Sequence, residues 1–495
     1  MRAASRKGLL CSAPALAALL SSCTVGPDYV KPKLETPEAY KEAAADQAQW
    51  NPSNPQAQLP RGKWWEVFND PALNALESQV DPANQSIAGA EAAYRQARAL
   101  VQVNRAGYFP TVSAGAAVSR YRGSENAPNA NAGNIGPNNN FLLSADVTWE
   151  IDLWGKIRRA VEASEATAQA FAADLETVRL SIQAELAFDY FLLRGVDAQR
   201  QLLDQTIEAY RTALELTRNR FEGGVAAEVD VAQAKTQLRT TEAQAIDLGV
   251  QRALLEHAIA LLIGKPPAAF SLRPAPLDAS PPNIPLEQPS HLLERRPDVA
   301  SAERQVAAAN ARIGVAKAAY FPTLTLSGVA GFASSDVDHW LSWPSRFWAV
   351  GPAISQTVYD GGLRRGLNDQ ALAAYDQSVA NYRQTVLVAF QDVEDNLASL
   401  RILAEEEKVQ ANAVKAANHS LELTNNRYEA GAANYLEVVV AQAVALNNQR
   451  TAVDISTRRI AASVRLVKAL GGNWSVAELP STSEVAQRTA KEAAR

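Results

Sequence analysis

The chain has 495 residues, which is more than one ordinary domain needs. Its 48 Lys and Arg against 53 Asp and Glu leave a net charge of -5, which argues against a nucleic-acid-binding protein with its usual basic excess. The two Cys predict no disulfide framework, and the four His lie at no metal-ligand spacing. With no nucleophile–base motif and no phosphate-binding loop, we expect neither an enzyme nor a metal or cofactor site.

The N-terminus has the layout of a secretory signal peptide. Basic residues precede a Leu- and Ala-rich stretch over residues 8–20, and small residues follow it. The segment Leu20-Ser21-Ser22-Cys23 resembles the bacterial lipobox, so we expect residues 1–22 to be removed and Cys23 to carry a lipid. The residue after Cys23 is Thr rather than the Asp that retains enteric lipoproteins at the inner membrane, which favours the outer membrane. An ordinary signal peptide with an incidental Cys is the alternative.

No run of eighteen apolar residues follows the signal, so we expect no transmembrane helix, and a membrane crossing would need β-strands. The rest of the chain instead contains one unit twice. GYFPTVSAG at 107–115 matches AYFPTLTLSG at 319–328 with an offset of 320 − 108 = 212 residues. LELTRNRFEGG at 214–224 matches LELTNNRYEAG at 421–431 with an offset of 421 − 214 = 207 residues. Two long matches in the same order indicate duplication of a half-protein.

This repeat predicts the domain organisation. We divide the chain into a signal peptide (1–22), a lipidated N-terminal extended segment (23–70), a first structural repeat (71–264), a Pro-rich linker (265–287), a second structural repeat (288–471) and a C-terminal tail (472–495).

Each repeat predicts a helix, two strands, a long helix and a shorter returning helix. The opening helix carries apolar residues at alternating spacings of three and four, a heptad seam that we interpret as packing positions. These residues are Ile87, Ala90, Tyr94, Ala97 and Val101 in the first repeat, and Val299, Ala302, Val306, Ala309, Ile313 and Ala316 in the second.

Strand patterns follow Phe-Pro in both repeats. Residues 141–151 alternate cleanly between apolar and polar, 111–120 alternate more weakly, and 324–332 and 348–358 each have an apolar face. The Asn/Gly/Pro-rich stretch 126–140 predicts a long loop. Strands of about ten residues fit a tilted bilayer crossing, and a soluble half-buried sheet is the alternative. Five nearby Trp suit either an interfacial aromatic belt or core packing: Trp149, Trp154, Trp340, Trp343 and Trp348.

The long helices are predicted by sixty-odd residues without Pro, from about Lys156 to Phe221 and from about Leu363 to Tyr428. Such helices reach on the order of 100 Å. Their Ala-rich, polar composition favours a tube with a watery lumen over a solid core. Shorter helices return over about 225–262 and 433–470, after turns that carry the Gly expected past a helix end.

One chain thus offers four strands at one end of a helical tube and two turns at the other. Four strands cannot close a barrel, and open edges in lipid cost several kcal/mol per unpaired group. Bacterial barrels begin at about eight strands, and three pooled copies would leave a pore. We therefore expect a trimer.

Three motifs carry a family resemblance: GPDYVKP at 26–32, WWEVFNDPALNAL at 64–76 and ERRPDVASAE at 294–303. On these motifs the chain resembles outer-membrane factors of the TolC type, in the NodT/OprM lipoprotein branch. The resemblance implies an α+β membrane protein in which a trimeric outer-membrane β-barrel, with four strands per chain, continues into a long periplasmic α-helical barrel. It also implies a homotrimer that works as a passive exit duct of a tripartite efflux pump. The implied partners are outer-membrane lipid, a periplasmic adaptor protein and an inner-membrane RND-type pump. A conduit for type I protein secretion is the alternative.

The resemblance also maps a channel gate onto the helical turns. The gate residues it predicts, together with neighbouring apolar residues that we expect to form a constriction, are Asp230, Tyr428, Leu436, Glu437, Val439 and Val440. A ring of carboxylates across a threefold axis would favour cations and respond to protonation, whereas a solvated helix face is the alternative. The sequence departs from the family pattern because Val440 replaces a common Asp and Ala433 replaces an Arg. We expect the adaptor to dock at Gly223, Gly224, Ala430 and Gly431, which are also helix caps.

Overall fold

The computed structural model describes residues 24–43, 62–124, 136–284, 289–472 and 474–487. The predicted signal peptide and the lipidation of Cys23 lie outside these residues and remain predictions. Within the described part of the chain, no helix combines the length and the apolarity needed to cross a membrane. The same residues contain no group of three or more His, Cys, Asp or Glu that could hold a metal ion.

The four predicted strands are present and form one antiparallel sheet in sequence order. They are β1 (Thr111–Tyr121), β2 (Asn138–Ile151), β3 (Thr323–Ser334) and β4 (Arg346–Ser355). In the register of the sheet, Ala145 of β2 lies opposite Ala114 of β1 and opposite Ala330 of β3. A shift of this register by one residue would move every side chain of the strand to the other face of the sheet. β2 begins inside the predicted loop 126–140.

The helices also follow the prediction, and the two repeats have helices of identical length. The matched pairs are α3 (Gln85–Ala106) with α7 (Pro297–Ala318), 22 residues each; α4 (Lys156–Glu222) with α8 (Leu363–Glu429), 67 residues each; and α5 (Glu228–Leu262) with α9 (Tyr435–Ala469), 35 residues each. The shorter elements are η1 (Trp64–Phe68), α2 (Pro71–Ala83), η2 (Pro267–Ala269), α6 (Pro289–Arg295), η3 (Trp343–Ser345), η4 (Val476–Glu478) and α10 (Thr482–Ala486).

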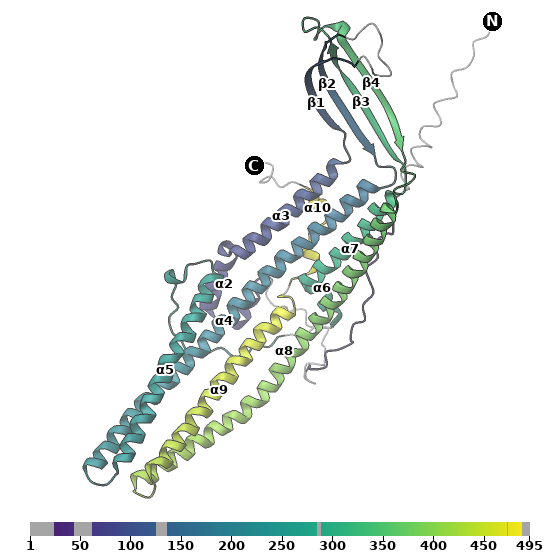
Figure 1. Ribbon diagram of the computed structural model, residues 1–495. Coiled ribbons are helices and arrows are strands. Elements are labelled where there is room, and N and C mark those ends of the chain that lie inside the picture. The colour runs from purple at the N-terminus through teal and green to yellow at the C-terminus, as the bar shows by residue number, and fades with distance from the viewer. Residues whose placement is uncertain (1–23, 44–61, 125–135, 285–288, 473, 488–495) are drawn as a thin grey trace, which may run out of the picture.

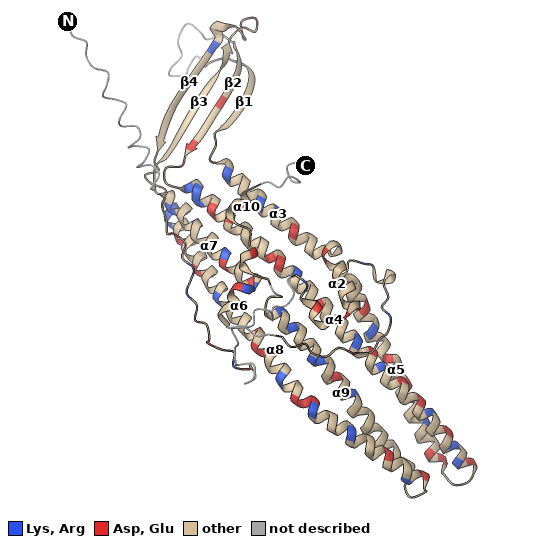
Figure 2. Cartoon of the chain, turned by 180° about the vertical axis from the view of Figure 1, so that it is seen from behind, with Lys and Arg blue, Asp and Glu red and all other residues tan. Residues whose placement is uncertain are grey.

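The elements form an elongated molecule with the sheet at one end and both helical turns at the other (Figure 1). In the half nearer the sheet, α4 packs between α3 and α7, and α8 packs on α7. In the half nearer the turns the order is α5, α4, α9 and α8. Figure 2 shows charged residues spread along the helices, whereas the strands carry very few.

In both repeats a hydrogen bond links the end of the returning helix to the start of the opening helix. In the first repeat the Asn84 side-chain amide donates to the Leu262 carbonyl at 2.8 Å. In the second, the Arg296 guanidinium donates to the Ala469 carbonyl at 3.1 Å. The side chains differ but both acceptors are the last residue of the returning helix, so the duplication extends to individual contacts.

The main hydrophobic core lies at mid-length, where the short α2 and the N-terminal segment cover α4. Phe68 from η1 packs on Phe191 of α4 with ring centroids 5.0 Å apart. Tyr190 donates its hydroxyl to Asp70, which also caps α2. These contacts place the most buried stretch of the molecule at the level where extended segments wrap the helices.

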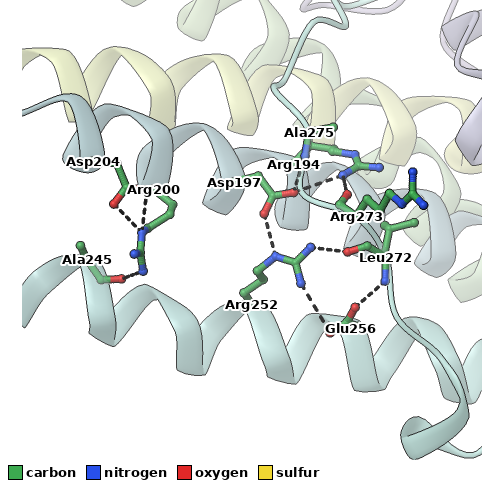
Figure 3. A network of polar contacts seen from close by, with 10 residues as sticks. All are labelled: Arg194, Asp197, Arg200, Asp204, Ala245, Arg252, Glu256, Leu272, Arg273 and Ala275. Carbon is green, nitrogen blue, oxygen red and sulfur yellow. Dashed lines mark hydrogen bonds and ion pairs between the residues drawn. The ribbon is translucent and has the colours of Figure 1, made fainter.

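A buried carboxylate ties the linker to the first repeat at this level (Figure 3). Asp197 of α4 accepts hydrogen bonds from Arg252 at 2.8 Å, from Arg194 at 3.1 Å and from the backbone of Ala275 at 3.1 Å. Glu256 of α5 accepts from the backbone of Leu272. Two arginines and a backbone amide therefore share one carboxylate that water barely reaches.

The second repeat is tied at the same level to the N-terminal segment instead. Glu394 of α8 accepts from the backbone amides of Lys41 and Glu42 at 2.8 and 3.0 Å. Arg401, which lies 207 residues after Arg194, pairs with Glu42 at 2.6 Å. Equivalent arginines in the two repeats thus hold two different extended segments.

The five tryptophans near the strands divide between the two interpretations. Trp149 and Trp154 are partly buried and donate to backbone carbonyls where the strands meet the helices. Trp340 packs against another ring. Only Trp343 and Trp348 are largely exposed, so an interfacial role is open to these two.

Candidate functional site

The two turns at the end of the molecule have the same conformation. In the first turn the Val225 amide donates to the Arg220 carbonyl, and in the second the Ala432 amide donates to the Arg427 carbonyl, both at 2.8 Å. In each case the donor follows the residue with left-handed backbone geometry, and the bond is that of a Schellman motif. Gly224 and Gly431 supply that residue, both with φ +74°. Gly223 and Ala430 keep right-handed helical geometry, so only the second position of each turn requires glycine.

The predicted carboxylates both cap the helices that leave these turns. Asp230 accepts from the backbone N–H of Ala227 at 3.2 Å. Glu437 accepts from the backbone N–H of Asn434 at 3.4 Å, and the Asn434 side chain accepts from the Glu437 amide at 3.0 Å, which completes a capping box. Arg427 forms a further ion pair with Glu437 at 3.3 Å. Each carboxylate therefore stabilises its own helix start, and within one chain they do not form a pair.

Tyr428 is buried, and it joins the two turns together. Its ring packs edge-on against Tyr435 at 5.3 Å, in an apolar cluster with Ala234 and Val438. Arg220, from the end of α4, lies 4.6 Å over the Tyr428 ring and donates to the Tyr428 carbonyl at 2.9 Å. Burial raises the pKa of Tyr435 to about 12. The two helical hairpins are thus fastened by a cation–π contact and a hydrogen bond.

The predicted apolar residues separate into two groups. Leu436, Glu437, Val440 and Val444 line one open groove of about 420 Å³ between α8 and α9. Leu436 and Val440 are exposed there. Val439 instead packs against the cluster that contains Tyr428. The structure therefore brings three of the predicted residues to one surface and assigns Val439 to the joint between the hairpins.

Sequence reasoning did not single out Arg220 or Tyr435, which make the joint. Arg220 had a detectable signal, because the motifs NRFEGG and NRYEAG both place an Arg before the aromatic residue of the turn. Tyr435 had none, because the position 207 residues earlier is Glu228. The fold alone shows that Tyr435 packs across the turn.

Comparison with known proteins agrees with this architecture. The family model described as "Outer membrane efflux protein" matches residues 76–265 and 288–472, once in each half. The chain is 31% identical over 465 residues to the solvent efflux pump outer membrane protein SrpC of Pseudomonas putida, covering 93% of this chain and 97% of that protein. It is 29% identical over 469 residues to outer membrane protein OprJ of Pseudomonas aeruginosa, covering 94% and 95% of the two chains.

Among solved structures, the outer-membrane channel OprN superposes with a TM-score of 0.83 at 31% identity, covering 91% of this chain and all of that one. The chain belongs to the outer membrane efflux protein family. Its predicted family and its predicted location in the outer membrane are confirmed.

Proposed function

We propose that this chain is the outer-membrane channel subunit of a tripartite, RND-type efflux pump. It would serve as a passive exit duct for small molecules and perform no bond chemistry. The observation that carries the proposal is the match over 93% of the chain to an outer-membrane protein of a solvent efflux pump. The elongated form supports it, with a nearly uncharged sheet at one end and long charged helices behind it (Figure 2).

The working unit of this proposal is a homotrimer of a tandemly duplicated chain. Within the described residues β1 and β4 each pair on one side only, so both edges of the sheet are open. Unpaired backbone groups in lipid are costly, and pairing β4 of one copy with β1 of the next removes both edges. Three copies would give a twelve-stranded barrel continuous with an α-helical barrel in the periplasm.

A lipid on Cys23 would anchor the sheet end. Thr24, the residue after Cys23, packs against Gly155 at the start of α4. The next amide, that of Val25, donates to the Trp154 carbonyl at 3.0 Å. These contacts hold the N-terminal segment where strands and helices meet, which suits an anchor in the same membrane as the sheet.

The far end would carry the gate and the adaptor contact. We assign the gate to Asp230, Tyr428, Leu436, Glu437, Val439 and Val440, which surround the two turns. We assign adaptor docking to the turn residues Gly223, Gly224, Ala430 and Gly431. The partners in this arrangement are a periplasmic adaptor protein and an inner-membrane pump.

The test is accumulation of a broad panel of solvents and antibiotics in a strain that lacks this chain. Complementation uses the natural protein and the Cys23→Ala variant. Deletion is expected to raise accumulation, the natural protein to reverse it, and the variant to reverse it less. If no compound accumulates while secreted proteins change, the chain is a conduit for type I protein secretion and the efflux proposal fails.

A further inference from the structure

The duplication allows a contact inside the chain to predict a contact between copies. α4 packs on α9 and α5 packs on α4, so α5 and α8 form the two outer edges of the helical layer (Figure 1). Since α8 repeats α4 and α5 repeats α9, the edge α8 has the packing surface that α4 uses on α9. The partner that fits this surface is the α5 edge of a second copy.

Burial at equivalent positions supports this assignment. Thr457 and Ala461 of α9 are 7% and 6% exposed because they face α4. The positions 207 residues earlier on α5 are Val250 and Leu254, which are 62% and 64% exposed although both are larger and more apolar. Large apolar side chains left in water at positions that are buried in the sister repeat indicate a missing neighbour.

The opposite edge shows the complementary pattern. Gly195 of α4 is buried, and a Cβ there would collide with the Thr457 side chain. Its equivalent on α8 is Ile402, which is 52% exposed. Ile402 and Val250 would therefore meet between copies where Gly195 and Thr457 meet inside the chain, with α8 and α5 further apart than α4 and α9 because Ile402 has the side chain that Gly195 lacks.

The contacts that link the two turns of one chain can also be carried over to equivalent residues of two copies. Arg220 donates to the carbonyls of Tyr428 and Glu429 and lies over the Tyr428 ring. Its equivalent is Arg427, and the equivalents of its acceptors are Phe221 and Glu222. Within one chain Arg427 contacts its own Glu437 and the Ala432 carbonyl, and Phe221 is exposed.

On this basis we infer that Arg427 of one copy lies over Phe221 of the next copy and donates to the carbonyls of Phe221 and Glu222. α8 of the first copy then packs on α5 of the second, with Ile402 against Val250. The inference rests on the proposed trimer and adds its register and its tip contact. Three joints inside chains and three between chains would then alternate around the tip.

The joint between copies is the weaker of the two kinds. In the joint inside a chain, the ring under Arg220 is Tyr428, and it packs on the second ring of Tyr435. In the proposed joint between copies, the ring under Arg427 is Phe221, and the residue equivalent to Tyr435 is Glu228. The second ring is replaced by a carboxylate, and Arg427 has a competing acidic partner in Glu437. Fewer apolar contacts and a competing ion pair both favour separation between copies.

Site-directed cross-linking tests the register. The detergent-purified Ile402→Cys/Val250→Cys protein is treated with a short bifunctional maleimide, after its oligomeric state is measured by light scattering. Covalent dimers and trimers are expected on denaturing gels. Ile402→Cys/Val103→Cys is the matched control, because Val103 is equally exposed but lies on α3 near the sheet, and it should give only monomers.

The Arg427 contact is tested by the dissociation temperature of the trimer on unboiled gels. Arg427→Ala is expected to lower it, whereas Arg220→Ala, which removes the joint inside each chain, should lower it less. A trimer that does not cross-link through the 402 and 250 positions, or whose dissociation temperature is unchanged by Arg427→Ala, overturns this inference and leaves the channel proposal standing. A monomeric protein in detergent overturns the trimer itself.

Discussion

Helices α4 and α8 have the same length and arise from the same repeat, yet their surroundings differ greatly. α4 has 27 buried residues of its 67, and α8 has 8 of 67. The returning helices show the reverse, with 7 buried residues in α5 and 15 in α9, although each has 35 residues. α4 and α9 lie inside the layer formed by one chain, and α5 and α8 lie at its edges.

The burial of a helix in this chain therefore depends on its position in the layer and not on which repeat unit it comes from. α4 takes the core contacts of the whole chain, including the buried network around Asp197. α8 has few buried residues, and it leaves Ile402 exposed at the position where α4 has the buried Gly195. Substitutions in α4 should therefore act on the fold of each chain, whereas substitutions in α8 should act mainly on assembly.

The largest effect is expected at the buried network of the first repeat. Asp197→Ala would leave Arg194 and Arg252 without their shared carboxylate, at a cost of about 3–5 kcal/mol in the free energy of unfolding. The position 207 residues later is Ala404, so the second repeat has no such charge to lose. Thermal unfolding in detergent measures the change.

Asp204→Ala is the matched control for this variant. Asp204 pairs with Arg200 on the surface of the same helix, and exposed pairs of this kind contribute less than about 1 kcal/mol. Equal destabilisation by the two variants would contradict the role assigned to the buried carboxylate.

An intermediate effect is expected from the close approach of α4 and α9. Gly195→Ala should destabilise the protein by about 1–3 kcal/mol, because the added methyl meets Thr457. The Thr457 hydroxyl donates to Val453 at 2.8 Å, which holds its rotamer in place. Gly249→Ala on the edge helix α5 is the control, since described residues leave open space there and alanine should stabilise the helix by up to about 1 kcal/mol. Melting curves that shift in the same direction for both variants would contradict the close approach of α4 and α9 at Gly195.

A pH-dependent effect is expected from Glu77 on α2. Both of its carboxylate oxygens are buried and have no hydrogen-bond partner among the described residues. Burial raises the pKa of Glu77 well above its ordinary value of 4.5, and the charge of Asp81 adds to the shift. The folded protein then keeps a proton that the unfolded chain releases, so stability falls by about 1.4 kcal/mol per pH unit as pH rises above 4.5 towards the folded-state pKa.

Glu77→Gln should remove this slope. Burial also raises the pKa of Asp189, to about 6, so the variant and the natural protein are compared between pH 6.5 and 8, where Asp189 contributes little to the difference. Asp189→Asn serves as the control and should change the slope only below about pH 6. The second repeat has Pro289 at the position equivalent to Glu77, so it has no matching carboxyl group there. If the Gln variant and the natural protein have parallel profiles above pH 6.5, Glu77 is ionised in the folded state.

Much of this architecture could be predicted from the sequence, because its signals are local. The alternation in 141–151 and the Pro-free stretch after Lys156 predicted β2 and α4 to within a few residues. The roles at the tip could not be read in the same way. Whether Tyr428 lines a lumen or fills a joint depends on Tyr435 and Arg220, which lie on other helices.

The same limit explains the capping carboxylates. Their spacing after each turn is compatible both with a gate and with a helix cap, and the hydrogen bonds show that the cap is made in one chain. The residues of α5 and α8 that we propose to act between copies carry no separate sequence signal. Only the unequal burial of equivalent positions distinguishes them.

The smallest expected effect on stability lies at the tip, where Asp230 and Glu437 cap equivalent helices. Replacing both by Ala should cost about 1 kcal/mol through lost caps, with the larger part at Glu437 because it also pairs with Arg427. If the two residues also form the gate, this double variant should raise the leak conductance in planar bilayers. Glu437→Gln separates the two roles, because Gln still completes a capping box but carries no charge. Conductance that rises with Gln as well as with Ala assigns the gate to the carboxylate charge, conductance that rises with Ala alone assigns it to the helix cap, and unchanged conductance in the double variant contradicts a gate at these positions.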